Sequence, residues 1–146
     1  MTKKSKRTIF AIITVLIVAG CGAIYYLWNK PHKDVVHANA IKIAATELYN
    51  IFSTNSIKAN TLYANKVVEI SGEVMQVSKN QQGQQIILLK TAVADASVNC
   101  TMEENFGGVK QGDNIIIKGI CSGYIAGDTS MDLPGDVFII RGYHLK

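Results

Sequence analysis

The stretch Val68-Glu69-Ile70-Ser71-Gly72-Glu73-Val74 decides the fold class of this chain. Its apolar residues alternate with polar ones, which is typical of a β-strand with one buried face. The alternation slips after this stretch, because the next apolar residues are Met75 and Val77. A slip of phase beside a glycine indicates a bulge or bend at Gly72. The pattern therefore predicts a long, bent first strand.

Four further strands follow the bent strand, and polar or glycine-containing turns separate them. They are expected at residues 85–89, 98–102, 115–124 and 137–145. A long loop, residues 125–135, precedes the last of them. Five strands with a bent first strand predict a mainly β fold, a small five-stranded OB-fold barrel. An SH3-like barrel has the same number of strands and is the alternative.

Two helical segments precede the strands. The first is expected at Asn39–Phe52, where apolar residues recur at three- and four-residue spacing and Asn39 is a suitable N-cap. The second is a short helix at Ser56–Tyr63 with Ser56 as its cap. The first segment has one apolar face, so an amphipathic helix is expected to precede the barrel.

The N-terminal segment carries the positive charge of the chain. The net charge is +4 overall, and it divides into +5 for residues 1–30 and −1 for residues 31–146. Ile9–Trp28 has no charged side chain, and as a helix it would span about 30 Å, the thickness of a hydrocarbon core. Residues 1–8 form a basic tail that is expected to stay in the cytoplasm. We therefore predict a single-pass anchor at residues 9–28, a tether at 29–38 and a domain at 39–146.

This topology places the domain outside the cytoplasm, on the periplasmic side of a bacterial membrane. A second interpretation rests on Val18-Ala19-Gly20-Cys21, which looks like a lipobox with Cys21 as the lipidated residue after cleavage. The apolar run continues to Trp28, which favours an uncleaved anchor. A soluble secreted product is the third alternative. The first two interpretations both tether the domain to the membrane.

The chain has no recognisable catalytic or metal-binding motif. It lacks a nucleophile elbow, an HExxH helix and a phosphate-binding loop. Its three histidines do not have zinc-type spacing, and Asp128, Asp132 and Asp136 are too sparse for a calcium loop. We predict neither enzymatic activity nor a metal or cofactor.

Two cysteines, Cys100 and Cys121, lie within the predicted strands. An even number of cysteines in an oxidising compartment is compatible with a disulfide between them. The alternative is a pair of buried free thiols that act as small apolar residues.

The chain resembles a family of membrane-anchored or lipoprotein OB-folds described as tRNA-anticodon-domain-like, found in envelope proteins of Bacteroidetes-type bacteria. The matching segments are Trp28–Val35, Tyr63–Gly72, Val98–Thr101, Lys110–Asp113 and Ile117–Tyr124. The last strand departs from the pattern, because Phe138–Gly142 lacks a cysteine that relatives often carry, and the loop 125–135 looks longer than usual. The resemblance implies the OB-fold and the anchoring, and it implies little about activity.

Many OB-folds bind nucleic acid through aromatic side chains and a basic groove. The net charge of −1 outside the N-terminal segment argues against that ligand. An envelope oligosaccharide, a peptide or a protein surface is a better candidate. The candidate ligand face comprises Lys79, Asn80, Gln82, Phe106, Tyr124, Asp128 and Asp132. The alternative function is a structural or assembly protein of the cell envelope without a small ligand.

Overall fold

The computed structural model describes residues 16–25, 35–128, 130–131 and 133–145. The chain divides into two compact units, residues 1–34 and 35–146, and each is treated by itself. In the first unit, residues 16–25 form a helix. The basic tail 1–8 and parts of the predicted anchor 9–28 and tether 29–38 lie outside the described residues. Within the described ranges, no helix is both long enough and apolar enough to cross a membrane.

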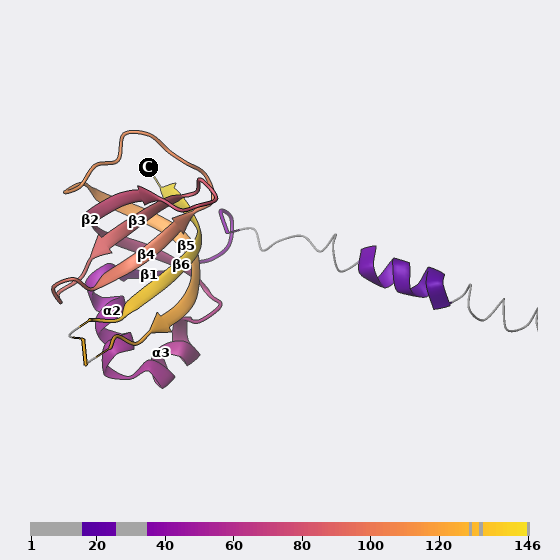
Figure 1. Cartoon of the computed structure of the whole chain (residues 1–146), viewed down its shortest axis with the longest axis horizontal. Coiled ribbons are helices and arrows are strands. Elements are labelled where there is room, and N and C mark those ends of the chain that lie inside the picture. Colours follow the sequence, from indigo (N-terminus) through magenta and orange to yellow (C-terminus); the bar gives the residue numbers. More distant parts are fainter. Residues whose placement is uncertain (1–15, 26–34, 129, 132, 146) are drawn as a thin grey trace, which may run out of the picture. The chain divides into compact units, whose positions relative to one another are not determined.

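The second unit is a closed five-stranded β-barrel (Figure 1). Its strands are β2 (Val67–Lys79), β3 (Gln85–Lys90), β4 (Ser97–Met102), β5 (Asn114–Ile125) and β6 (Asp136–Leu145). They follow the order β2-β3-β4-β6-β5, and β5 pairs with β2 to close the barrel. The pairing of β4 with β6 is parallel, whereas the other four pairings of the barrel are antiparallel. The predicted mainly β, OB-type barrel is confirmed.

The long strand β2 closes the barrel because its two halves pair with different strands. Val67–Glu73 pairs with β5, and the later half pairs with β3 after a register shift between Val74 and Gln76. Gly72 lies just before this shift, and a Cβ there would stand 3.0 Å from the Cβ of Ala45. The missing side chain therefore allows helix α2 (Ala45–Thr54), which precedes β2 in the chain, to approach the strand closely. The bend predicted at this point of the sequence is present.

The helix expected at Asn39–Phe52 begins later than predicted. Residues Ile41–Ala44 form a short strand, β1, which pairs with Val68–Ser71 of β2 in parallel, and helix α2 covers Ala45–Thr54. Asn39 does not cap α2; its N-cap position is Ala44, which makes no side-chain cap hydrogen bond. Tertiary pairing with β2 outweighs the helical spacing, because it gives the backbone of Ile41–Ala44 sheet partners and buries Ile43.

The short helix α3 (Ser56–Tyr63) has the bounds predicted from the sequence. Its N-cap is Asn55 instead of Ser56, since the Asn55 side chain accepts a hydrogen bond from the Lys58 amide at 3.0 Å. Together α2 and α3 cover one end of the barrel, where Leu48 and Phe52 are fully buried (Figure 1). The other end of the barrel carries the β2–β3 turn and the long β4–β5 connection.

Candidate functional site

The outer surface of β3 and β4 is the part of an OB-fold that most often receives a ligand. On β3, Ile87 and Leu89 are fully buried in the barrel, whereas Ile86 and Leu88 between them are partly exposed. On β4, Val98 and Cys100 are buried, and Asn99 lies between them with partial exposure. Because side chains alternate across a strand, the partly exposed residues point away from the core.

Strand register brings these outward residues into two rows. The first row joins Gln76 to Leu88, Leu88 to Asn99, and Asn99 to Phe138, each pair directly opposite across neighbouring strands. Phe138 faces outward because its neighbours Val137 and Ile139 are fully buried. With strands spaced ~4.8 Å apart, this row covers about 14 Å of surface.

The second row joins Ser78 to Ile86 and Ile86 to Thr101. We call the two rows together the β3–β4 face, and its members are Gln76, Ser78, Ile86, Leu88, Asn99, Thr101 and Phe138. None of these seven residues is charged. Both strands at its centre have hydrogen-bonded neighbours on each side, so the face offers side chains and no free sheet edge.

A hollow of about 620 Å³ adjoins the face at the C-terminal end of β3, beside Lys90. It lies where β2 bends, and it is lined by the start of α2, the end of β3 and the start of β5. The Lys90 ammonium and the Glu73 carboxylate both line it and form an ion pair at 3.6 Å. Lys90 is exposed and lies two residues beyond Leu88, so the hollow continues the outward surface of β3.

Four of the predicted site residues gather at the opposite end of β3. Lys79 and Phe106 line a smaller hollow of about 280 Å³. Phe106 stacks on His144 with ring centroids 4.4 Å apart, and its amide donates to the Gln85 side chain at 3.0 Å. Asn80 and Gln82 form the β2–β3 turn, in which Asn80 Oδ1 accepts from the Gln82 amide at 3.0 Å. The packing of Phe106 and the bonds of Asn80 serve the local structure.

Tyr124 and Asp128 lie toward the end of the barrel that the helices cover. Tyr124 is on β5 and packs against α2, and Asp128 is in the loop between β5 and β6. The Tyr124 ring stacks on Phe52 at 6.0 Å and contacts the edge of Tyr49 at 6.1 Å, so it belongs to the aromatic packing under α2. Asp128 accepts hydrogen bonds from the hydroxyl and amide of Ser130, which lower the pKa of its carboxyl group. Asp132 lies outside the described residues.

The predicted residues therefore flank the β3–β4 face at both ends and do not form one patch. Gln76, Leu88, Asn99 and Phe138 are not among the site residues predicted from the sequence. Ile86-Ile87-Leu88-Leu89 reads as one buried run, and no alternation in it shows that Ile86 and Leu88 face outward. The polar residues of β4, at every second position, were the available signal.

The thiols of Cys100 and Cys121 are both free and buried. Each residue pairs with Ile139, one from β4 and the other from β5, so strand β6 lies between them. Two strand spacings of ~4.8 Å exceed the Cα separation of about 4.4–6.8 Å that a disulfide needs. Burial raises the pKa of Cys100, and it raises the pKa of Cys121 to about 11. Cys21, the candidate lipidation site, is exposed on the helix of residues 16–25.

The sequence of the chain matches the family model tRNA_anti-like over residues 1–131. The chain belongs to the tRNA_anti-like family. No match was found among curated proteins.

Comparison with solved structures finds several that are similar to this tRNA_anti-like chain. One is a "putative nucleic acid-binding lipoprotein" from Klebsiella pneumoniae, which is 18% identical with a TM-score of 0.50 and covers 80% of this chain and 100% of its own. Another is a "putative aspartyl-tRNA synthetase" from Leishmania major, which is 11% identical with a TM-score of 0.43. That match covers 80% of this chain and 22% of the synthetase. At 18% identity the likeness to the Klebsiella structure concerns the fold alone.

Proposed function

We propose that this chain is a non-catalytic OB-fold binding module, tethered to the membrane on its extracytoplasmic side, and that the β3–β4 face receives its ligand. The observation that carries the proposal is the composition of that face. Amide, hydroxyl and aliphatic side chains and one aromatic ring stand outward in register, on strands whose interior residues are fully buried. Such a rigid surface with a few placed polar groups suits recognition and lacks the paired groups that catalysis needs.

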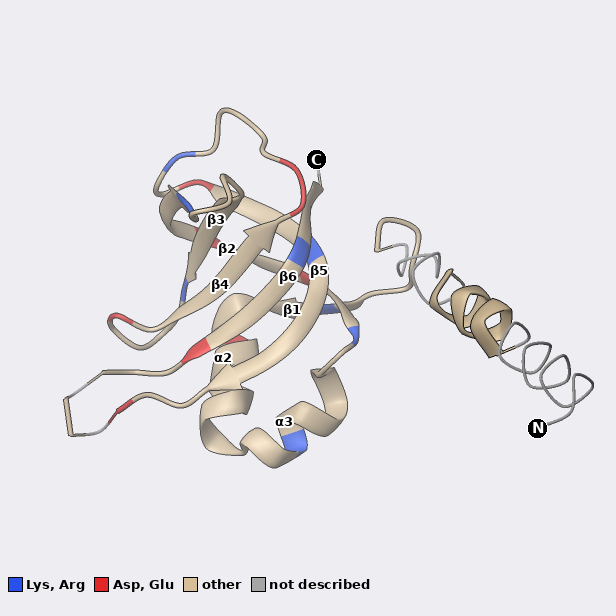
Figure 2. Ribbon diagram, turned by 45° about the vertical axis from the view of Figure 1, so that its right-hand side comes forward, with Lys and Arg blue, Asp and Glu red and all other residues tan. Residues whose placement is uncertain are grey.

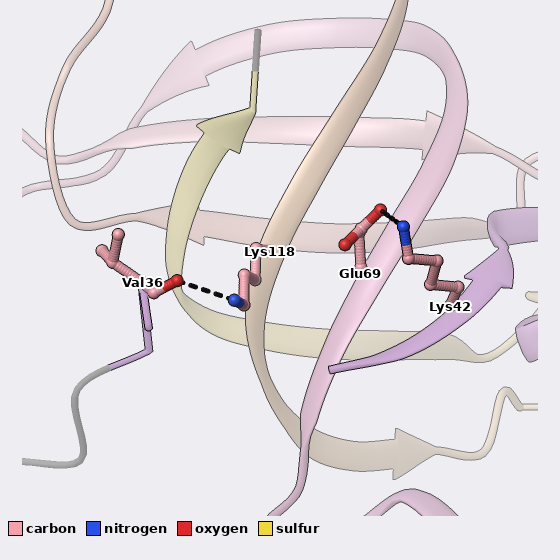
Figure 3. A network of polar contacts seen from close by, with 4 residues as sticks. All are labelled: Val36, Lys42, Glu69 and Lys118. Atoms are coloured by element: carbon pink, nitrogen blue, oxygen red, sulfur yellow. Dashed lines mark hydrogen bonds and ion pairs between the residues drawn. The ribbon is translucent and has the colours of Figure 1, made fainter. Parts of the chain in front are cut away.

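The start of the domain is fixed on the side of the barrel away from the β3–β4 face. Lys118 on β5 is buried, and its Nζ donates a hydrogen bond of 2.7 Å to the carbonyl oxygen of Val36 (Figure 3). In the strand order β5 is two strands away from both β3 and β4. The backbone at Val36 is therefore held on the wall opposite the β3–β4 face.

The nature of the anchor has two alternatives, an uncleaved helix at residues 9–28 or a lipid on Cys21. The description of the Klebsiella structure as a lipoprotein supports the second alternative. Mass spectrometry of the N-terminus of the mature protein distinguishes them. An intact Met1 or Thr2 terminus supports the helix, and a diacylglyceryl-modified Cys21 supports the lipoprotein.

Nucleic acid is not the ligand that we propose, although the Klebsiella protein carries that description. The seven residues of the face contain no Lys or Arg, and the nearby Lys90 is already paired with Glu73. Figure 2 shows the basic positions of the barrel spread over several elements, without a continuous stripe along β3 and β4. Phosphate binding depends on clustered cations, and this surface does not provide them.

A structural or assembly role is the second candidate function. The observation that favours it is apolar exposure beside the same face, since Ile140 is 42% exposed and Ile86, Leu88 and Phe138 are partly exposed. A protein partner could cover these side chains.

Nuclear magnetic resonance on the full-length chain in lipid nanodiscs tests the proposed function. Neutral hexasaccharides, the single-stranded oligonucleotide dT12 and an extended decapeptide are titrated separately at physiological salt. We expect at least one probe to shift amide resonances of β3, β4 and β6 around the face, with β5 unaffected. Shifts confined to β5 or the helices, or no shift with any probe, would refute the binding function of the face.

A further inference from the structure

The chemistry of the β3–β4 face points to one class of ligand. We propose that the face binds a neutral oligosaccharide, with Gln76 and Asn99 contacting hydroxyl groups and Phe138 packing against a sugar ring. This inference rests on the proposed function, because it names the ligand of the same face. Three observations carry it: the absence of charge, the order of side chains along the first row, and the absence of a free strand edge.

The absence of cationic side chains on the face argues against an anionic ligand. The outward row Gln76, Leu88, Asn99, Phe138 presents no cation, and neither does the row Ser78, Ile86, Thr101. A polyanion bound here would leave its charges without partners on the surface that it covers. The comparable row on the opposite wall is different, because Lys42, Glu69 and Lys118 stand opposite one another there. The two rows of the β3–β4 face are thus uncharged, whereas the ion pair of Lys90 with Glu73 lies beyond them, at the hollow that adjoins the face.

The order of side chains along the first row suits a sugar chain. A carboxamide provides both donors and acceptors, and a sugar hydroxyl also has both roles, so each amide can bond a hydroxyl in either sense. Gln76 and Asn99 stand on either side of Leu88, and Phe138 follows Asn99 on the next strand. Polar and apolar groups therefore alternate along about 14 Å. A pyranose chain likewise presents hydroxyl edges and apolar ring faces in alternation.

Strand pairing argues against an extended peptide as the ligand. Peptides bind to sheets chiefly by adding a strand to an open edge, where their backbone amides find partners. Here β3 is paired with β2 and β4, and β4 is paired with β3 and β6. A peptide lying across the face would lose water from its backbone amides without gaining a ladder of hydrogen bonds. A sugar needs only the side chains that are present.

Isothermal titration calorimetry on the full-length chain in nanodiscs tests the inference. The probes are cellohexaose, maltohexaose and chitohexaose as neutral chains, a hexamer of galacturonic acid as an anionic chain, and dT12. We expect at least one neutral hexasaccharide to bind, with an affinity that changes less than twofold between 50 and 300 mM salt. Tighter binding of the anionic hexamer or of dT12, or no binding of any neutral hexasaccharide, would overturn the inference.

Side-chain variants locate the contact. Gln76→Ala and Asn99→Ala are each expected to weaken binding by about fivefold, the net effect of one neutral hydrogen bond. Gln111→Ala is the matched control, because Gln111 is an exposed glutamine on the β4–β5 connection, and it should bind like the unmodified chain. Phe138→Leu keeps an apolar side chain on β6 but removes the ring, and it should weaken binding by about tenfold. Equal binding by Phe138→Leu and the unmodified chain would overturn the role given to the ring.

The two proposals fail in distinguishable ways. If dT12 or the decapeptide shifts resonances on the β3–β4 face while every neutral hexasaccharide is inert, the face binds a ligand and the sugar inference is wrong. If no probe shifts the face, both proposals are wrong. Circular dichroism of each variant confirms that its barrel is folded before its affinity is compared.

Discussion

Two opposite walls of the same barrel carry rows of outward side chains with different chemistry. On the wall of β1, β2 and β5, the row is Lys42, Glu69, Lys118 and Tyr143. On the wall of β3 and β4, the row is Gln76, Leu88, Asn99 and Phe138. Side chains alternate across the strands on both walls. The two walls therefore differ in the type of residue at their outward positions, which is mostly charged on one wall and uncharged in the rows of the other.

The charges of the first wall are used within the molecule. Lys42 pairs with Glu69 at 3.1 Å, and Lys118 binds the Val36 carbonyl (Figure 3). The second wall has no charged residue in its rows and leaves amides and one ring outward. The comparison teaches that one wall holds the incoming chain, while the other remains available to a partner outside the molecule. The following predictions test that division.

The largest expected effect is a difference in the free energy of unfolding between a buried and a partly exposed residue of β3. Leu89→Ala should lower the free energy of unfolding by about 2–5 kcal/mol, because the Leu89 side chain is fully buried and its loss leaves a cavity. Leu88→Ala is the matched control on the next residue, and it should cost under about 1 kcal/mol since Leu88 is partly exposed. Urea denaturation measures both values. Equal losses would show that Leu88 is a core residue and that the face is not an outward surface.

The next effect concerns the thiols that each wall directs into the barrel. Burial raises the pKa of Cys121 from 9.0 to about 11, so its reactive thiolate at pH 8 should be about a hundredfold scarcer than in the unfolded chain. Cys100 is more deeply buried, and its raised pKa acts in the same direction. We expect both cysteines to react with iodoacetamide only after unfolding, without any reductant. If unfolding alone releases neither thiol and a reductant releases both, a disulfide joins them.

The smallest effect tests the hold of the β5 wall on the incoming chain. Lys118→Met keeps the aliphatic length of the side chain but removes the ammonium group, so the Val36 carbonyl loses that donor. The substitution should lower the free energy of unfolding by about 1–3 kcal/mol. Lys110→Met, at an exposed lysine, is the control and should cost almost nothing. Hydrogen exchange should show faster exchange of residues 35–38 in Lys118→Met only. Unchanged exchange there would mean that the contact does not hold the chain, and glycan binding should be unaffected in both variants.

Parts of this architecture could be predicted because local pattern and tertiary structure agree. The alternation before Gly72, the turns between strands and the spacing in Ser56–Tyr63 each indicate the element that forms. Ile41–Ala44 is the counterexample. Its residues fit the periodicity of the following helix, yet they form β1, because they pair with β2. In this pairing Ile41 lies opposite Val68, which is 27 residues further along the chain. Local periodicity contains no information on such a partner.

The candidate site was less predictable than the fold. Phe106 was predicted to belong to the ligand face, but the structure uses its ring in a stack with His144. Gln76, Leu88, Asn99 and Phe138 are separated by 11 or more residues along the chain, and only strand register makes them neighbours. Their common surface depends on three strand pairings that single-sequence patterns do not specify.

The sequence by itself determined the five strands of the barrel, the bend of the first of them and the division of charge between the N-terminal segment and the domain. These follow from local causes, namely the two-residue alternation, the absence of a side chain at Gly72 and the sign of each residue. Only the tertiary structure decided which outward residues share a wall, that β6 separates Cys100 from Cys121, and that Lys118 binds the Val36 carbonyl. The physical reason is that closure of the barrel sets the register between distant strands, and register decides which side chains meet.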